Sequence, residues 1–521
     1  MSLPWFSNLL AGFARCRRGN IAVIFALALM PVTLLAGGSV DLSTAMNARS
    51  RLAQALDAAA LAVGTNSTIS DEDALAIATG FINANYPERE LGNITSVTVT
   101  LDPVTDSVTV RGEAEVHTTM LALAGIPTIT VHWESVAQRA RQRIELAMVL
   151  DNTGSMSGSK ITALRGAARL LSEILFEGID EPGDVKIGLV PFAATVNVGT
   201  GFARDWWLDP NAVSPTHAQW AGGDQSTEVC TGRGRRRTCT TTTIHPNHWD
   251  LFDDLRNTPW GGCVEARALP MDIDDTTPNL GRPETLFTPY FAPDEPDLSG
   301  FSNSYLSDDL LSGVLGSVLN RLRNLVKYDD GRPDFNGPNA ACTVTPITPL
   351  TTSRSRVDTA ISAMAASGNT NIANGVSWGV RVLSPQMPFS EGVAYEDRTV
   401  LKAMVILTDG ENVLSGQSND FMSRYEAYGY ISDNRLGVRT SNNNLLGDAL
   451  DARTAAACAY AKSQGIRVYT ITFQVNSSST RNLMQACASS ESLYFDSPST
   501  SALRDAFEMI AGDLANLRLS R

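Results

Sequence analysis

Basic residues are scarce in this sequence. Its 521 residues include 41 lysines and arginines against 55 aspartates and glutamates, a formal net charge of −14. A protein whose main partner is nucleic acid normally carries clustered basic residues, so this composition argues against DNA or RNA. Histidines are also few, at five. The spacing of His245 and His248 suits a metal, but no further ligands accompany them, and we expect no metal site there.

Long apolar runs are equally few, and one is long enough to span a membrane. Ile21–Val40 contains no charge over about twenty positions, the length that a helix needs to cross the hydrocarbon core. Three arginines precede this run and Asp41 follows it, so the positive-inside rule places residues 1–18 in the cytoplasm and the long C-terminal part outside. Ala36–Gly38 could serve as a signal-peptide cleavage site, but the run is long for such a peptide, and we expect an uncleaved anchor.

The apolar pattern continues beyond the membrane segment. Apolar residues recur at helical spacing from Asp41 to Val63, which predicts that residues 19–64 form a transmembrane anchor and an amphipathic helical stalk ending at Gly64. The sequence pattern of residues 65–140 then predicts a short helix and a small antiparallel sheet. Its three expected strands lie at 96–101, 107–114 and 128–135.

Only one cysteine, Cys16, precedes the apolar run. An even number follows it, which allows three disulfides if that side of the membrane is oxidising; buried free thiols are the alternative. The cysteines in question are Cys230, Cys239, Cys263, Cys342, Cys458 and Cys487.

Carboxyl and hydroxyl groups are concentrated directly after one apolar segment. Ile144–Leu150 is typical of a buried strand and delivers Asp151 to the carboxyl edge of a sheet, where open α/β folds bind their ligands. Asp151, Thr153 and Ser155 alternate along the chain, so one carboxylate and two hydroxyls can meet at one point. Such oxygen ligands suit Mg²⁺ or Mn²⁺. The simpler alternative is that Asp151 and Ser155 cap the following helix.

Residues 143–521 alternate apolar strands with amphipathic helices. This alternation predicts an α/β domain with a doubly wound, mostly parallel sheet. Residues 200–345 fit it poorly and contain several tryptophans and clustered aspartates, so we interpret them as an irregular insertion. Asp272 and Asp274, from one such cluster, are expected at the surface, with calcium binding as the alternative.

This domain resembles von Willebrand factor A domains over most of residues 143–518, apart from the insertion. Their metal-ion-dependent adhesion site combines a D-x-S-x-S motif, a threonine in a Gly-Thr-like turn and an aspartate at a strand end, often within TDG. Asp151, Thr153 and Ser155 occupy the first part, with threonine replacing the first serine; Thr370 in SGNTNIANG and Asp409 in ILTDGEN match the others. The resemblance implies that these residues hold Mg²⁺, or Mn²⁺ or Ca²⁺, and leave one position for an Asp or Glu carboxylate of a protein partner.

The resemblance also bears on the cysteines. Cys458 precedes the expected strand 466–473 and Cys487 follows it, and these elements are neighbours in such a fold, so this bridge is favoured. Cys263 and Cys342 bracket much of the insertion and could staple it. The remaining pair, Cys230 and Cys239, flanks the arginine-rich stretch GRGRRR, which is either a solvated loop tip or a basic loop for an acidic partner.

The N-terminal region, RRGNIAVIFALALMPVTLLAGG and its Ala/Leu/Asp-rich continuation, resembles TadE/TadG-like proteins of Flp (tight adherence) pilus assembly. Pilin-like precursors are cut after a glycine and carry glutamate at the fifth mature position. Here Ile24 stands at that position after Gly19, so we expect the segment to remain as an anchor. The resemblance implies a single-pass inner-membrane protein with a cytoplasmic N-terminus, a periplasmic bulk and other pilus-assembly components as partners.

Phosphoryl transfer is the enzymatic alternative, because Asp151-Asn-Thr-Gly-Ser is close to the D-K-T-G-T motif of P-type ATPases. However, Asn152 replaces the lysine, Thr153 stands where an Asp-x-Asp motif beginning at Asp151 would have its second aspartate, and no GDGxxxD-type second motif appears. One spanning helix also cannot form a pump. We therefore expect a non-enzymatic, metal-dependent protein-binding component of Flp pilus assembly or anchoring. A surface adhesin or pilus-tip protein is the alternative, and a Mg²⁺-dependent phosphohydrolase is a less favoured one.

Overall fold

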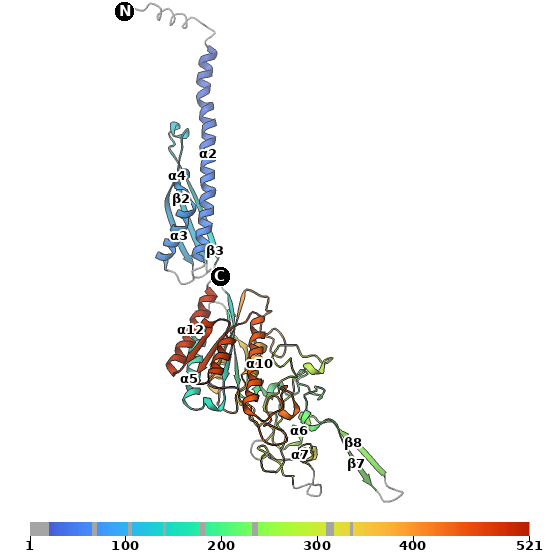
Figure 1. Cartoon of the computed structure of the whole chain (residues 1–521). Helices are drawn as coiled ribbons and strands as arrows, with labels where there is room; N and C mark the ends of the chain where they lie inside the picture. Colours follow the sequence, from blue (N-terminus) through green and yellow to red (C-terminus); the bar gives the residue numbers. More distant parts are fainter. Residues whose placement is uncertain are drawn as a thin grey trace, which may run out of the picture. The chain divides into compact units, whose positions relative to one another are not determined.

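The computed structural model describes residues 20–64, 70–102, 107–138, 142–177, 183–231, 238–308, 317–333 and 337–519. The chain divides into two compact units: the first comprises Met1–Arg141 with Leu519–Arg521, and the second spans Gln142–Arg518 (Figure 1). The expected cytoplasmic segment 1–18 and the arginine-rich stretch 232–237 lie outside the described residues.

The first unit is built on one long helix, α2 (Asn20–Gly64), which continues through Pro31. Its N-terminal half extends beyond the small sheet beside it (Figure 1), and its apolar side chains there are exposed, as at Leu27 and Leu35. Among the described residues, this is the one helix that is long and apolar enough to cross a membrane, as an anchor or a signal sequence would be.

The C-terminal half of α2 packs on a three-stranded antiparallel sheet. Leu52 and Leu56 of the helix and Val108 and Val110 of the sheet are fully buried together, and a Cβ at Gly112 would lie 3.0 Å from Leu56, so glycine allows the close approach. Beside them lie α3 (Asp71–Asn85), α4 (Glu88–Leu91) and the turn η2 (Leu121–Ala124). The strands are β1 (Asn93–Asp102), β2 (Ser107–His117) and β3 (Thr128–Gln138), in that order.

The second unit contains a mixed, mostly parallel sheet, which confirms the predicted fold class. The strand order is β13-β12-β11-β4-β5-β6-β9, and β10 pairs with β5. The first five strands of that order run parallel, whereas β6, β9 and β10 join in antiparallel fashion. The strands are β4 (Arg143–Asp151), β5 (Val185–Phe192), β6 (Val196–Asn197), β9 (Cys263–Val264), β10 (Thr348–Thr351), β11 (Val400–Thr408), β12 (Arg467–Phe473) and β13 (Tyr494–Ser497).

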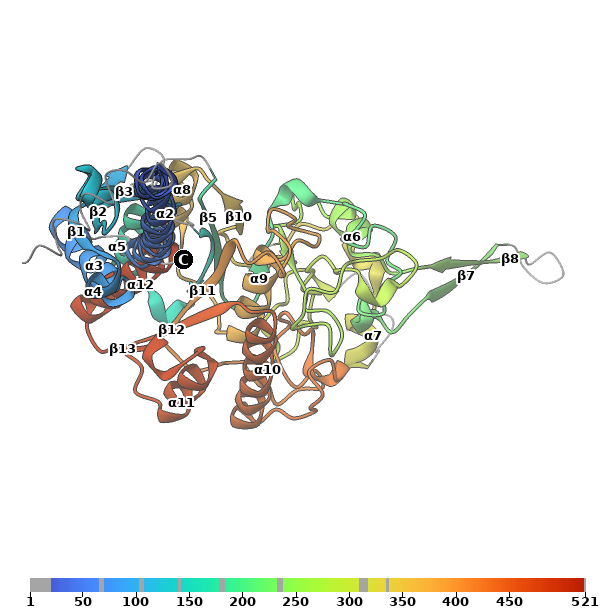
Figure 2. The same cartoon turned by 90° about the horizontal axis from the view of Figure 1, so that it is seen from above.

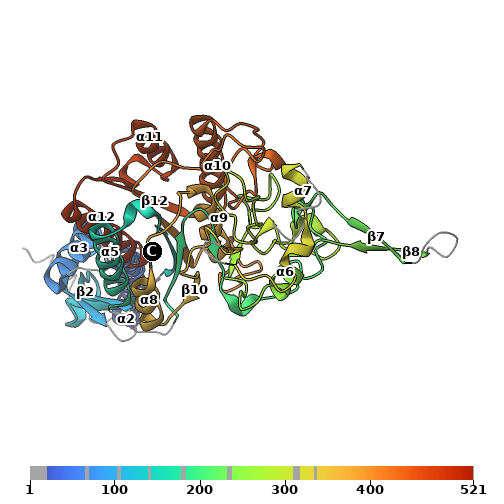
Figure 3. The same ribbon diagram turned by 90° about the horizontal axis from the view of Figure 1, so that it is seen from below.

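Helices cover both faces of this sheet, as the views from above and below show (Figures 2 and 3). One face carries α5 (Ser159–Phe176), α8 (Arg354–Ala363) and α12 (Thr500–Leu519). The other carries α9 (Ile372–Leu383), α10 (Asn443–Ser463) and α11 (Ser478–Cys487). Helix α9 is buried on all sides, because the irregular segments cover the surface that it turns away from the sheet.

The insertion shares its core with the sheet. Phe287 lies 5.1 Å from the ring of Trp378 on α9, so the insertion continues the core on that face. It contributes the hairpin β7 (Gln225–Thr231) and β8 (Thr238–Ile244), with α6 (His248–Asp254) and α7 (Val318–Leu322). Its buried aromatic side chains include Trp207, Trp220, Trp249, Trp260, Phe291 and Tyr328.

One prediction about the insertion is wrong. Asp272 was expected at the surface, but it is only 4% exposed. Its carboxylate forms an ion pair with Arg453 and accepts a hydrogen bond from the Tyr428 hydroxyl at 2.8 Å. Asp274 pairs with the buried Arg267 at 3.1 Å. Each pairing neutralises a buried charge, that of Asp272 or that of Arg267, because an unpaired charge would be costly at such depth.

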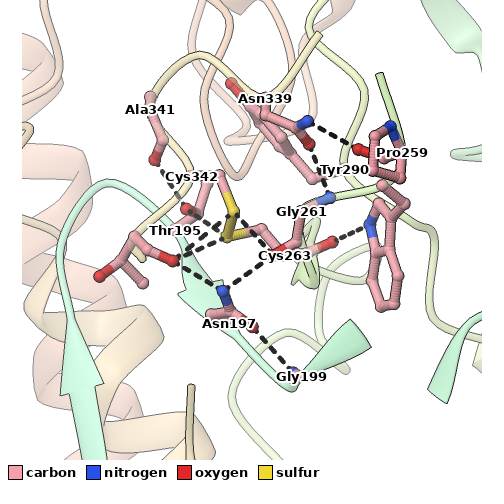
Figure 4. Close-up of a disulfide and its surroundings, with 12 residues drawn as sticks. Thr195, Asn197, Gly199, Pro259, Gly261, Cys263, Tyr290, Asn339, Ala341 and Cys342 are labelled. Carbon is pink, nitrogen blue, oxygen red and sulfur yellow. Dashed lines mark hydrogen bonds between the residues drawn. A yellow bond between two sulfur atoms is a disulfide. The ribbon is translucent and has the colours of Figure 1, made fainter. Parts of the chain in front are cut away.

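Two disulfides tie the second unit together. Cys458 of α10 is joined to Cys487 of α11, the pairing favoured from the sequence, and Cys263 of β9 is joined to Cys342. Around the latter bridge, Thr195 donates a hydrogen bond to the Ala341 carbonyl at 2.8 Å (Figure 4). In the third candidate pair, Cys239 is disulfide-bonded and its backbone lies opposite that of Cys230; the side chain of Cys230 lies outside the described part of the chain.

Candidate functional site

The candidate residues meet at β4, where the order in which the chain adds strands to the sheet reverses. From β4 the chain moves to β5 on one side and later returns to β11 on the other. The register pairs Leu150 with Leu407, so the two parallel strands end level with each other. Asp151 is the last residue of β4 and Asp409 follows β11 directly. This edge is the switch point at which open α/β sheets bind their ligands.

Four of the five predicted ligands form one hydrogen-bonded series. The Thr153 hydroxyl donates to Asp151 Oδ1 at 2.6 Å and lies 3.0 Å from the Ser155 hydroxyl. Ser155 in turn donates to Asp409 Oδ1 at 2.5 Å. Asp151 and Thr153 are buried, whereas Ser155 is exposed. The series therefore joins two buried carboxylates, those of Asp151 and Asp409, through one buried and one exposed hydroxyl residue.

Asp151 is the most deeply buried member of this series. Its second oxygen, Oδ2, accepts a hydrogen bond from the Thr408 hydroxyl at 2.8 Å. Burial, together with the nearby charge of Asp409, raises the pKa of Asp151 to about 6, although the hydrogen bonds from Thr153 and Thr408 act in the opposite direction. A cation bound nearby would favour the charged carboxylate. The site is therefore electrostatically suited to a positive ion.

Thr370 lies in a neighbouring loop. Gly154 donates its N–H to the Gly368 carbonyl at 2.9 Å, and Ser367 donates to the Asn152 carbonyl at 2.7 Å. These bonds bring the two loops together. Thr370 is 5% exposed, and its carbonyl accepts the N–H of Val413 at 2.8 Å. The structure thus places the loop at the site but does not link the Thr370 hydroxyl to the other four residues.

Sequence reasoning missed two residues beside the site. Lys160, in the first turn of α5, places its Nζ 2.6 Å from Asp409 Oδ2 and balances that charge. Asn152 is fully buried, and both polar atoms of its side chain lack a partner in the described part of the chain. The lysine follows closely after the Asp151 motif, so helical spacing could have identified it. Nothing in the sequence distinguishes Asn152.

The donor set fits a hard divalent cation through its chemistry. Two carboxylates and two hydroxyls offer oxygen atoms within hydrogen-bond distance of one another, and oxygen is the ligand that Mg²⁺, Mn²⁺ and Ca²⁺ prefer. Over the described ranges, no three His, Cys, Asp or Glu side chains gather as a metal-binding group. A cation held here would therefore depend on the hydroxyl oxygens as well as on the carboxylates.

A cavity of about 350 Å³ adjoins the Thr370 loop. Its lining includes Gly368 and Asn369 of that loop, Glu295 of the insertion, and Glu426. Asn369 donates a hydrogen bond to Glu426 Oε1 at 2.5 Å. Burial raises the pKa of Glu426 to about 7, against the weaker effects of Asn369 and Arg424. The insertion therefore contributes to the surroundings of the site.

Comparison with known families identifies the N-terminal region. Residues 19–66 match the family described as Flp pilus-assembly TadE/G-like. No curated protein matches the chain.

Several solved structures are similar to the chain at low sequence identity. The pilus adhesin SpaC from Lactobacillus rhamnosus GG is 13% identical, with a TM-score of 0.32; the match covers 80% of this chain and 34% of that one. The vWF domain of the type V pili tip protein Mfa5 from Porphyromonas gingivalis is 9% identical, with a TM-score of 0.32, over 72% and 96%. A von Willebrand factor type A protein from Catenulispora acidiphila is 8% identical, with a TM-score of 0.27, over 81% and 50%.

The chain spans about a third of the length of SpaC. Because these TM-scores are low, the assignment of the fold rests on the strand order of the second unit and on the position of the Asp151 motif at its switch point. The chain combines a TadE/G-like N-terminal region with an α/β unit that has a mixed, mostly parallel sheet.

Proposed function

We propose that this chain is a membrane-anchored, non-enzymatic protein that binds partner proteins through a divalent cation during the assembly or anchoring of Flp pili. The observation that carries the proposal is the hydrogen-bonded series from Asp151 to Asp409, in a chain with a TadE/G-like N-terminal region. The partners are other pilus-assembly components that offer an Asp or Glu carboxylate.

Each site residue has a distinct role in this proposal. Ser155, Thr153 and Thr370 supply neutral hydroxyl oxygens, so the site keeps part of the ion's positive charge. Asp151 and Asp409 hold the ion in place, and Thr408 fixes the orientation of Asp151 through its hydrogen bond. Bound Mg²⁺, Mn²⁺ or Ca²⁺ would supply the charge that attracts the partner's carboxylate. The exposed position of Ser155 leaves the outer side of the site accessible.

The proposed location is the inner membrane, with residues 1–18 in the cytoplasm and the bulk of the chain in the periplasm. The exposed apolar half of α2 supports an anchor. The disulfides Cys263–Cys342 and Cys458–Cys487 support an oxidising compartment for the second unit.

A pulldown from solubilised membranes tests the proposal, using the full chain with Mg²⁺ or with EDTA. Asp409→Asn is the test variant. Asp397→Asn is the matched control, because Asp397 accepts hydrogen bonds from Thr399 just before β11, at the opposite end of the strand from Asp409. We expect EDTA and Asp409→Asn each to abolish partner capture and Asp397→Asn to retain it. Capture that survives both treatments would rule out the metal-dependent mode.

Two further experiments separate the alternatives. Immunolabelling that finds the chain along external fibres would favour a surface adhesin or a pilus-tip protein that uses the same site. A phosphohydrolase would need Asp151 as the nucleophile, yet both of its oxygens accept hydrogen bonds and the residue is fully buried. Trapping an acyl-phosphate at Asp151 would establish that activity.

A further inference from the structure

We propose that the loop joining β2 to β3, residues 118–127, inserts into the lipid surface beside α2 and forms a second membrane contact for the first unit. This inference rests on the proposed membrane anchor. The loop reads TTMLALAGIP and contains no charged residue. A loop of this composition suits the apolar and interfacial region of a lipid bilayer.

The loop packs on the part of α2 that belongs to the uncharged run. A Cβ at Gly37 would lie 2.2 Å from Met120 Cγ, and one at Gly38 would lie 3.1 Å from Leu121 Cδ2. Larger residues at these positions would displace the loop. Gly37 precedes Val40, the end of the uncharged run, by about one helical turn, or roughly 5 Å along the axis. The loop therefore lies level with the end of the segment that spans the bilayer.

Asp41 fixes the loop to the helix. Its carboxylate accepts backbone hydrogen bonds from Thr119 at 3.1 Å and from Met120 and Leu121 at 2.8 Å each. The carboxylate is nearly buried, at 7% exposure of the residue. These N–H groups begin the turn η2 and would otherwise lack partners. A single helix residue thus holds three consecutive residues of the loop.

Several backbone groups of the loop are paired within it. Leu123 donates to Met120, Gly125 to Ala122 and Ile126 to Leu121. Thr118 also donates its N–H to the Pro127 carbonyl at 3.0 Å. A loop in water has no need of such pairing, because water completes its hydrogen bonds. A loop in contact with lipid does need it, since each unpaired backbone group is costly there.

The side chains that the loop presents are apolar and uncovered. Leu123 is 79% exposed, Ile126 48% and Met120 40%. They continue the exposed apolar surface of α2, where Leu35 is 76% and Val40 65% exposed. The exposed apolar surface of the membrane-spanning part of α2 and that of the loop adjoin each other in one unit. Lipid that surrounds the helix can therefore also contact the loop. Two contacts then restrict the tilt of this unit on the membrane.

Spin labelling of the full chain in phosphatidylcholine/phosphatidylglycerol vesicles tests the loop. The label is placed at Leu123→Cys in a Cys16→Ser background, and the parent Cys16→Ser protein is treated in parallel as the blank. Thr98→Cys, an exposed position on β1 of the same unit, is the matched control. We expect the label at 123 to collide more often with lipid-soluble oxygen than with water-soluble Ni-EDDA, with a ratio severalfold above that at 98.

Asp41→Asn should shift this ratio at 123 towards the value at 98, because the amide weakens the three hydrogen bonds. Equal ratios at 123 and 98 in vesicle-bound protein would overturn the loop contact and leave the anchor intact. A chain that fails to float with the vesicles would overturn the anchor and the loop contact together. Neither result depends on the metal site or on a pilus partner.

Discussion

Lys160 and Ser155 engage both oxygens of Asp409: the lysine Nζ lies 2.6 Å from Oδ2, and the serine hydroxyl donates to Oδ1 at 2.5 Å. The ammonium group therefore occupies one side of the carboxylate that is proposed to hold a cation. The two positive charges would compete for the same negative charge.

Removal of this competitor should strengthen metal binding. Lys160→Met keeps the aliphatic stem and removes the charge, and we expect Mg²⁺ to bind about threefold to tenfold more tightly, because the repulsion between partly exposed charges is about 1 kcal/mol. Isothermal titration calorimetry measures the affinity. Lys462→Met is the control, since that ammonium group donates to the Ala486 carbonyl on α11. Unchanged or weaker binding in Lys160→Met would show that the lysine does not oppose the ion.

Added Mg²⁺ should stabilise the second unit, because an ion that binds only the folded state shifts the unfolding equilibrium. At a concentration one hundred times the dissociation constant, the stabilisation is about 2.7 kcal/mol, which raises the melting temperature by several degrees. Differential scanning fluorimetry follows this shift and its reversal by EDTA. Ser155→Ala should lose the shift, whereas Ser157→Ala, an exposed serine of the same turn, should keep it. A shift of equal size in both variants would argue against Ser155 as a ligand.

The disulfide of the insertion should contribute more stability than the one between α10 and α11. Cys263 and Cys342 are 79 residues apart, against 29 for Cys458 and Cys487. Loop-closure entropy then predicts that the first double serine variant loses about 4 to 5 kcal/mol and the second about 3 to 4 kcal/mol. Urea unfolding measures both losses. The opposite ranking would mean that packing, and not chain entropy, determines what each bridge contributes.

Glu426 should make stability depend on pH in an unusual direction. Its pKa in the folded protein is about 7, above the ordinary value of 4.5, so the fold favours the protonated acid. That contribution is present below about pH 4.5 and is lost as the pH rises towards 7. Glu426→Gln removes the cost of ionisation, and we expect it to gain about 2 to 3 kcal/mol over the parent protein between pH 5 and pH 8.

Unfolding curves at the two pH values test this expectation. Glu508→Gln, on an exposed face of α12, controls for the loss of one negative charge. Stability profiles of Glu426→Gln and the parent protein that run parallel from pH 5 to pH 8 would show that Glu426 is ionised throughout.

The sheet could be predicted because its central strands are continuous apolar runs. Residues 144–150 and 466–473 are expected as strands, and the structure has β4 and β12 there. Both faces of these strands are covered by helices, which is why the runs show no alternation. Placement of Asp151 and Asp409 at one edge follows from the same parallel arrangement. Their role as metal ligands, with Thr153, Ser155 and Thr370, stays a prediction.

The structure of the insertion could not be predicted because its sequence shows little periodicity. Its strand β9 has only two residues, too few for any pattern. Its core is held by contacts between rings far apart in the sequence, such as Phe287 and Trp378. Asp272 is predicted to be exposed for a related reason. A charged residue is expected at the surface unless its partner is known, and Arg453, the partner of Asp272, is distant in the sequence. Lys160 was missed although its spacing from Asp151 was visible.

The outer strands of the large sheet limit how copies of this chain can assemble. One end of the sheet is β13, with four residues, and the other is β9, with two. Because these edge strands are so short, they offer few free backbone N–H and C=O groups. They therefore discourage the addition of a strand from another molecule. If this protein enters a fibre, its large sheet is therefore poorly suited to polymerise by strand exchange, and contacts between side chains or helices would have to join the subunits.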